Sequence, residues 1–110
     1  MKKGIATLLF VFLLIAIILH QVFFIVEIKG RSMEPTYRDG DFVLATRLCS
    51  VKENDVVVID HDGEIVIKRI ETIYPKSKTM FVLGDNTNLS EDSRDYGCLP
   101  LTSIHGSVLK

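Results

Sequence analysis

The sequence predicts a mainly β protein, with one N-terminal transmembrane helix followed by a small, partly open β-barrel or sandwich. Two observations support this fold class. From Gly4 to Val26 the 110-residue chain has no charged residue and is almost entirely apolar. Beyond that run, short stretches of β-branched and aromatic residues alternate with turn residues, and no stretch has a helical period. We therefore divide the chain into an N-terminus with its anchor, residues 1–26, and one outer β-domain, residues 27–110.

The apolar run is long enough to cross a membrane, since a helix rises ~1.5 Å per residue and the hydrocarbon core is ~30 Å thick. Lys2 and Lys3 precede it and Glu27 follows it, which predicts a cytoplasmic N-terminus and an outer domain beyond the cytoplasmic membrane. A cleavable secretory signal also begins with basic residues, but its apolar region is shorter and ends in a small-x-small site. No such site precedes Val26. We therefore expect a retained, single-pass anchor.

Four strand-like runs and a tail make up the outer domain. The runs cover residues 42–46, 56–59, 65–70 and 79–83, and the tail over residues 99–109 is expected to add a last short strand. Between the second and third runs, Asp62-Gly63 supplies the positive φ angles of a type I′ hairpin. A domain of roughly 80 residues has only a marginally stabilising core, and contact with the bilayer would help to stabilise it.

The composition excludes several functions. The formal net charge is −1 and the basic residues are not clustered, so we expect no nucleic-acid partner. His20, His61 and His105 lack the spacing of metal ligands, and we expect neither a metal nor a cofactor. Cys49 and Cys98 are compatible with one disulfide or with two buried thiols. We favour buried thiols, because each cysteine has apolar neighbours.

A serine follows closely behind the apolar run. Ser32 is six residues beyond Val26, which places it within ~20 Å of the membrane surface at ~3.3 Å per extended residue. Ser32 has no adjacent His or Asp to activate it. If it is a nucleophile, its base comes from further along the chain.

One lysine has the sequence context of such a base. Side chains alternate along a strand, so Lys68 shares a face with Val66 and Ile70, whereas Arg69 points the other way and can be an ordinary solvated charge. Burial lowers the pKa of a lysine, and a neutral amine can act as a general base. Most strand lysines instead extend their ammonium group to water. The alternation alone leaves both interpretations open.

Four motifs stand out along the chain. The first, Ser32-Met33-Glu34-Pro35-Thr36, resembles the Ser-Met-x-Pro-Thr nucleophile box of the type I signal peptidases, the bacterial leader peptidases. Residues 54–58 look like their Gly-Asp-x-Val strand with Asn54 in place of Gly, and residues 67–70 match the Lys-Arg box. Residues 84–97 match the Gly-Asp-Asn…Ser-x-Asp-Ser-Arg…Gly box without a gap. The resemblance covers roughly residues 25–110, and the boxes occur in the order of the family.

The resemblance implies specific roles. Ser32 would attack the scissile carbonyl, and Lys68 would take its proton and later activate the deacylating water. Ser90 occupies the position of a hydroxyl that orients the base. Asp92 and Arg94 match a supporting ion pair, and Asp85 also looks structural.

Two departures from the family pattern stand out. Gly30 occupies the position where the family often has an oxyanion-hole hydroxyl, which leaves the Ser32 backbone N–H as the main donor. Loss of one such donor can cost on the order of 10²-fold in kcat. Only 15 residues separate Lys68 from Gly84, so the additional β-domain of larger members is missing. Relatives from the endoplasmic reticulum and archaea have His in place of the lysine, so this chain resembles the bacterial or organelle inner-membrane type.

The resemblance also implies a substrate class: pre-proteins whose signal peptides carry small residues at positions −3 and −1. The substrate is expected to bind as an added β-strand near Ile67. Candidate pocket walls are the apolar residues Val26, Ile28, Met33, Tyr37, Val66 and Ile67.

We therefore interpret the chain as a monomeric, membrane-anchored signal peptidase that acts through an acyl-enzyme, with pre-proteins and membrane lipid as its partners. Two alternatives remain open. Self-cleaving repressor-type peptidases share the fold core and the Ser-Lys pair, although they are soluble. A catalytically weak or inactive membrane-tethered domain could instead serve in assembly or as a chaperone.

Overall fold

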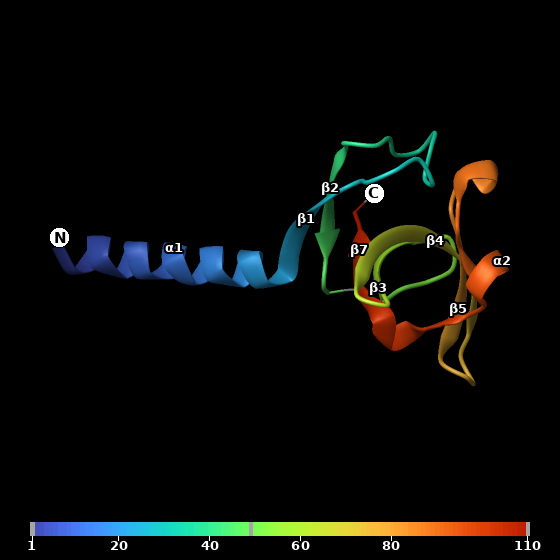
Figure 1. Cartoon of the computed structure of the whole chain (residues 1–110). Coiled ribbons are helices and arrows are strands. Elements are labelled where there is room, and N and C mark those ends of the chain that lie inside the picture. The colour runs from blue at the N-terminus through green and yellow to red at the C-terminus, as the bar shows by residue number, and fades with distance from the viewer. Residues whose placement is uncertain (1, 49, 110) are drawn as a thin grey trace.

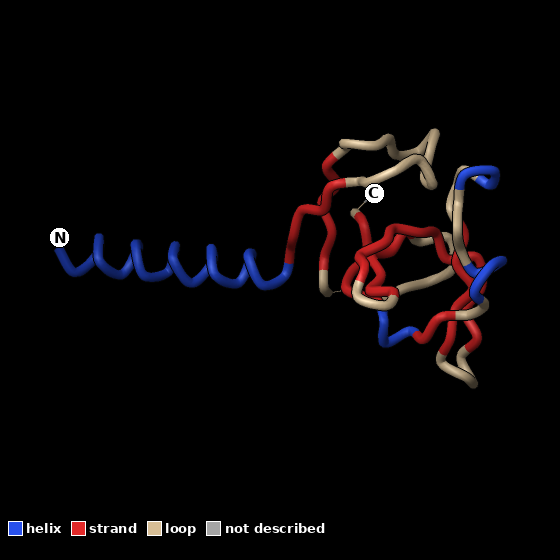
Figure 2. Tube along the Cα trace, in the orientation of Figure 1, coloured by secondary structure: helices blue, strands red, loops and turns tan. Residues whose placement is uncertain are grey.

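The computed structural model describes residues 2–48 and 50–109 of the chain. One long helix leads into a seven-stranded sheet, and three short helical turns lie between the last three strands in chain order (Figures 1 and 2). The elements are, in chain order, α1 (Lys2–Val22), β1 (Phe23–Glu27), β2 (Phe42–Thr46), β3 (Val56–His61), β4 (Glu64–Tyr74), β5 (Thr79–Leu83), η1 (Thr87–Leu89), α2 (Ser93–Tyr96), β6 (Leu99–Pro100), η2 (Leu101–Ser103) and β7 (Ile104–Val108).

Helix α1 projects from the sheet as an isolated arm in Figure 1, and the molecule measures 62 × 35 × 24 Å along its principal axes. None of its described residues is buried. Its 21 residues are long and apolar enough to cross a membrane, as the charge-free run predicts. By length and composition, a membrane anchor and a signal sequence both fit this helix.

The sheet is antiparallel throughout and has the strand order β1-β2-β7-β3-β4-β5-β6. The strands curl around one another, as Figure 1 shows, but β1 and β6 are not paired with each other, so the sheet stays open. The prediction of an N-terminal apolar helix followed by a mainly β domain is confirmed.

The helix ends earlier than the apolar run does. Residues Phe23 to Glu27 form β1 and pair with β2, from Phe23 opposite Thr46 to Glu27 opposite Phe42. Alternate side chains of β1, those of Phe24 and Val26, pack against the core. The run therefore contains two elements, and the sheet begins four residues before the change in composition.

The remaining strands lie close to their predicted positions. The runs at residues 42–46 and 79–83 match β2 and β5, while β3 and β4 extend beyond the predicted runs and meet at a hairpin. At that hairpin Asp62 has a φ of 53° and Gly63 a φ of 86°, as a type I′ turn requires.

Strand β3 separates two apolar clusters and is the most deeply buried strand. Val56 and Val58 face the first cluster, whereas Val57 and Ile59 face the second. The first cluster also contains Ile28, Met33, Ala45, Ile67 and Val108; the second also contains Ile70, Met80, Val82 and Leu99. Burial on both faces explains why residues 56–59 of β3 are a continuous run of β-branched residues.

The prediction of buried thiols is wrong for Cys98, which is a free, exposed cysteine. It follows Gly97, whose φ of 82° ends the short helix α2, and in the next strand Leu99 takes the buried position. Apolar neighbours therefore did not imply a buried thiol here. Cys49 lies outside the described residues.

Candidate active site

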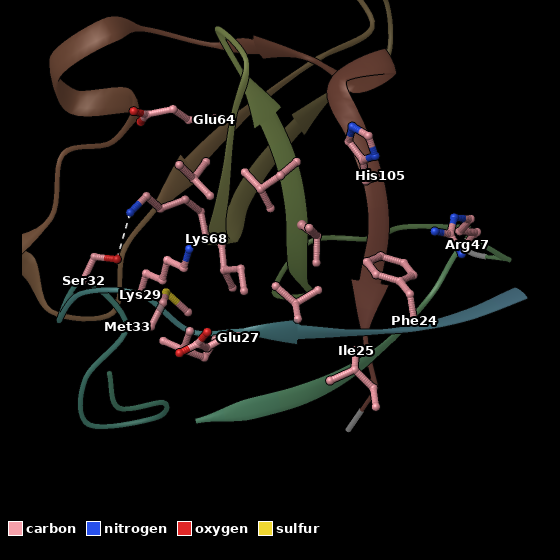
Figure 3. Close-up of a pocket in the computed structure, with 16 residues that line it drawn as sticks. Phe24, Ile25, Glu27, Lys29, Ser32, Met33, Arg47, Glu64, Lys68 and His105 are labelled. Carbon is pink, nitrogen blue, oxygen red and sulfur yellow. Dashed lines mark hydrogen bonds between the residues drawn. The ribbon is translucent and has the colours of Figure 1, made fainter. Parts of the chain in front are cut away.

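Ser32 and Lys68 lie together although 36 positions separate them in the sequence. The Lys68 Nζ donates a hydrogen bond of 3.0 Å to Ser32 Oγ, drawn as a dashed line in Figure 3. Ser32 belongs to the turn after β1, and Lys68 to β4. The distance between Lys68 Nζ and Ser32 Oγ is that of a hydrogen bond, so a neutral amine at this position can take the proton of the hydroxyl.

Contacts on both sides hold the turn that carries Ser32. The adjacent Met33 is only 1% exposed and belongs to the first apolar cluster. On the opposite side, the backbone N–H of Asn86 donates to the Ser32 carbonyl at 2.8 Å, and Asn86 Nδ2 donates to the Arg31 carbonyl at 3.2 Å. The hydroxyl is thus fixed between the core and the loop that follows β5.

Lys68 is 5% exposed and lies between Val66 and Ile70 on β4, both of which pack in the second cluster. Burial lowers the pKa of Lys68 below its ordinary value, and the negative charges of Asp92 and Glu91 partly oppose this shift. A lysine in this environment loses its proton at lower pH than one in water, which favours its use as a base.

Asp92 is the hub of the loop behind Lys68, and its side chain is fully buried. It accepts hydrogen bonds from Ser90 Oγ at 2.8 Å and from the Gly84 N–H at 2.9 Å. Arg94 forms an ion pair with it at 2.9 Å. Burial acts to raise the pKa of Asp92, but the hydrogen bonds from Arg94, Gly84 and Ser90 have the larger combined effect. The pKa of the carboxyl therefore lies well below its usual range, and the group stays ionised at neutral pH.

Ser90 was predicted to orient the base directly. In the structure its hydroxyl donates to Asp92, whose charge in turn acts on Lys68. Among the described residues, Ser90 makes no direct hydrogen bond to Lys68. The orienting role of Ser90 stays a prediction, and in this structure it would act through Asp92.

Arg69 is not the solvated charge that strand alternation predicted. Its guanidinium forms two hydrogen bonds with Asp85, of 2.9 and 2.8 Å, and a third with the carbonyl of Asn54. Asp85 also accepts a bond from the Thr36 hydroxyl at 2.6 Å. The prediction failed because the partners of Arg69, the Asp85 carboxylate and the Asn54 carbonyl, come from loops that are distant from it in the sequence. Through Asp85 and Thr36, the ion pair ties the loop after β5 and the nucleophile turn to the strand of the lysine.

The backbone at Gly30 fits the absence of a side-chain oxyanion donor. Gly30 has a φ of +84°, a region that favours glycine, and its N–H donates to Asp39 at 2.7 Å. Among the described residues, the N–H of Ser32 donates no hydrogen bond. The sequence predicts this N–H as the oxyanion donor, and that role stays a prediction.

Ser32 and Lys68 lie at one end of an open cleft of about 850 Å³, shown in Figure 3. Five of the six predicted pocket residues line it; Tyr37 does not, and packs instead against the first cluster. The five are Val26, Ile28, Met33, Val66 and Ile67.

The cleft has a charged rim that sequence reasoning did not identify. Besides Ser32 and Lys68, its charged and polar lining residues come from four segments of the chain that are distant from one another in the sequence. They are Glu27 and Lys29 at the end of β1, Arg47, Glu64 and His105. Among the described residues, no group of three or more His, Cys, Asp or Glu side chains is arranged to hold a metal ion.

The family model described as Peptidase S24-like matches residues 12–96. The match covers most of the chain and includes the nucleophile turn, the lysine strand and the Asp92 loop. The chain belongs to the Peptidase S24-like family, and its peptidase domain implies a serine peptidase. No curated protein matches the chain.

Proposed function

We propose that this protein is a membrane-anchored signal peptidase, which removes N-terminal signal peptides from exported pre-proteins. The observation that carries the proposal is the 3.0 Å hydrogen bond from buried Lys68 to Ser32 at the wall of an open cleft. The family match supports the peptidase chemistry. The apolar helix directly before the cleft supports a substrate that lies in a membrane.

In the proposed reaction, neutral Lys68 takes the proton of the Ser32 hydroxyl as its oxygen attacks the scissile carbonyl. The oxyanion is stabilised by the N–H of Ser32. Lys68 then donates its proton to the departing amine, which leaves an ester on Ser32. Lys68, neutral again, then takes a proton from a water molecule, which attacks and hydrolyses the ester. This step restores the free Ser32 hydroxyl.

Two unpaired strand edges border the cleft and suit an extended substrate. Among the described strands, β1 pairs with β2 alone, and residues 64–68 of β4 pair only with β3, since β5 ends opposite Arg69. Residues of both β1 and β4 line the cleft. An extended peptide between them would hydrogen bond to an edge strand while its side chains enter shallow pockets. Val26, Ile28, Val66 and Ile67 give those pockets apolar walls, which suits alanine-sized residues.

The start of the sheet supports a retained anchor over a cleaved signal sequence. β1 begins at Phe23, immediately after α1, and is fully paired with β2. A peptidase binds an extended, accessible segment, whereas Phe24 and Val26 pack in the core. Removal of α1 at its outer end would cut at or into this strand. We therefore propose a single-pass protein with its N-terminus in the cytoplasm and its cleft outside.

The test is cleavage of a pre-protein with alanine at −3 and −1 by the detergent-solubilised full chain. We expect cleavage by the wild type, and a loss on the order of 10⁴-fold or more in Ser32→Ala and Lys68→Ala, because the two groups act as a unit. Ser50→Ala and Lys76→Ala are matched controls, since both residues are exposed and lie outside the cleft. Full activity in either dyad variant would remove the dyad from the mechanism.

The same assay separates the two alternatives. A self-cleaving peptidase would shorten its own chain over time in the wild type and not in Ser32→Ala, without cutting the pre-protein. An assembly factor or chaperone would leave both the pre-protein and its own chain intact. Intact chain and shortened pre-protein are the outcome we expect.

A further inference from the structure

A second hollow lies where helix α1 meets the sheet; it shares Phe24, Ile25 and Arg47 with the cleft, but Ser32 and Lys68 do not line it. It has a volume of about 490 Å³ and is lined by Leu19, His20, Phe23, Phe24, Ile25, Leu44 and Arg47. These residues come from the last turn of α1, from β1, and from β2 with the residue after it. We call this hollow the junction notch. None of its lining residues is acidic, and Arg47 and His20 supply its basic groups.

Arg47 is held firmly in the wall of the notch. Its backbone N–H donates to the Val22 carbonyl at 2.7 Å, and its Nη1 donates to the Gln21 carbonyl at 3.2 Å. The guanidinium carbon lies 4.3 Å from the centroid of the Phe24 ring. These contacts satisfy two carbonyls at the end of α1, which is one role for Arg47.

Capping the helix leaves most of the guanidinium unused. Arg47 is exposed, and among the described residues its side chain donates a single hydrogen bond, although a guanidinium carries five N–H groups. A planar fork of free donors that is already fixed in place matches the oxygens of a phosphate. The notch therefore presents a pre-oriented anion site beside an apolar surface.

The apolar side chains that line the notch are exposed. In the antiparallel pair, Ile25 lies opposite Leu44, and both side chains point away from the core. They are 70% and 46% exposed. Leu19 lies on the last turn of α1, and its side chain is also exposed. A ligand that fits this site needs an anionic head for Arg47 and an apolar chain that can run along α1.

We propose that the junction notch binds one anionic glycerophospholipid, with its phosphate on Arg47 and an acyl chain against Leu19, Ile25 and Leu44. The inference rests on the proposed membrane anchor, because α1 must lie in the bilayer for a lipid to reach the notch. The depth of the notch in the membrane also fits a phospholipid. The notch lies at the end of the apolar helix, where phospholipid headgroups meet water. The bound lipid would fix how the domain, and with it the cleft, sits on the membrane.

The test is native mass spectrometry of the full chain in detergent, to which phosphatidylglycerol or phosphatidylcholine with identical acyl chains has been added. The lipid that stays bound after the detergent is removed in the spectrometer is measured. We expect the wild type to retain phosphatidylglycerol more than phosphatidylcholine. Arg47→Gln should weaken phosphatidylglycerol retention roughly tenfold, the effect of one charge-assisted contact, and Arg47→Lys by less. Leu44→Ser should weaken retention of both lipids, because it shortens the acyl contact. Arg38→Gln, at an exposed arginine outside the notch, is the control.

Several outcomes would overturn the inference. They are equal phosphatidylglycerol retention by the wild type and Arg47→Gln, an equal loss in Arg38→Gln, and no preference between the two lipids. A two-chain species that disappears in Leu44→Ser would instead assign the notch to a second copy. Alkaline carbonate extraction of membranes tests the anchor separately. A chain that stays in the membrane, yet binds lipid independently of Arg47, would contradict this inference alone.

Discussion

At the scale of single residues, the proposed chemistry depends on the balance between two opposing effects on the pKa of Lys68. Burial between Val66 and Ile70 favours the neutral amine, while the charges of Asp92 and Glu91 favour the ammonium ion, and burial is the larger effect. Asp92 cannot be removed without cost, because it also holds Gly84, Ser90 and Arg94. Glu91 is exposed, so its charge can be changed without disturbing this network.

The first prediction at this scale concerns the pH dependence of cleavage. Only the neutral amine of Lys68 is a base, so kcat/KM should rise with pH through the pKa of Lys68 in the free enzyme. Glu91→Gln removes a charge that raises this pKa. The rising limb should therefore move to lower pH, with an unchanged plateau.

The matched control for this pH profile is Glu71→Gln, an exposed glutamate on the same strand as the lysine. Its charge is not one of the causes of the Lys68 shift, so its profile should overlay that of the wild type. A limb that moves to higher pH in Glu91→Gln, or that moves equally in both variants, would contradict a neutral lysine base.

A second residue-scale prediction concerns Gly84. A Cβ at this position would lie 2.7 Å from the Ser32 carbonyl oxygen and 2.5 Å from Ser90 Cβ, and would collide with Ser90 Oγ. Gly84→Ala must therefore displace the nucleophile turn or the loop of Ser90. A displacement of about 1 Å can cost on the order of 10²-fold in rate, and we expect a loss of that size in kcat/KM.

Gly4→Ala is the control for Gly84→Ala, because a Cβ at Gly4 meets nothing within 4 Å. Both variants should be compared by cleavage rate and by thermal melting. A Gly84→Ala protein that is as active as the wild type would mean that the close approach of these loops does not matter for catalysis.

At the scale of elements, the sequence predicted what local patterns encode. Alternation and turn chemistry located β2, β5 and the β3–β4 hairpin. The sequence did not predict β1, because Phe23 to Val26 have the same apolar composition as the helix before them. Only their pairing with β2 makes these residues a strand. The sequence also assigned Arg69 to solvent, since nothing near Arg69 in the sequence indicates that Asp85 is its partner.

The candidate site shows the same limit more sharply. Alternation predicted an apolar face for Lys68, but no local rule connects it to Ser32. The pairing of the two residues came from the order of the four motifs, and the structure brings them within hydrogen-bond distance. The charged rim of the cleft could not be predicted, because Lys29, Glu64 and His105 meet there only once the sheet has curled.

At the scale of the whole molecule, the continuity of α1 with β1 determines how far the cleft can move from a membrane. No loop separates the two elements. Arg47, the residue after β2, donates hydrogen bonds to the carbonyls of Gln21 and Val22 and so joins β2 to the end of the helix. A substrate anchored in the same bilayer would then meet the cleft at a high effective concentration, set by this short connection.

The last prediction tests this coupling. A ten-residue Gly-Ser linker inserted between Val22 and Phe23 should leave cleavage of a soluble peptide unchanged, because the cleft and dyad lie beyond the insertion. Cleavage of a membrane-inserted pre-protein should fall several-fold, since effective concentration decreases as a flexible linker lengthens. The two rates are measured on the same protein reconstituted in vesicles, so the soluble peptide serves as the internal control. Equal rates on the pre-protein with and without the linker would show that the bilayer supplies the substrate without help from the rigid junction.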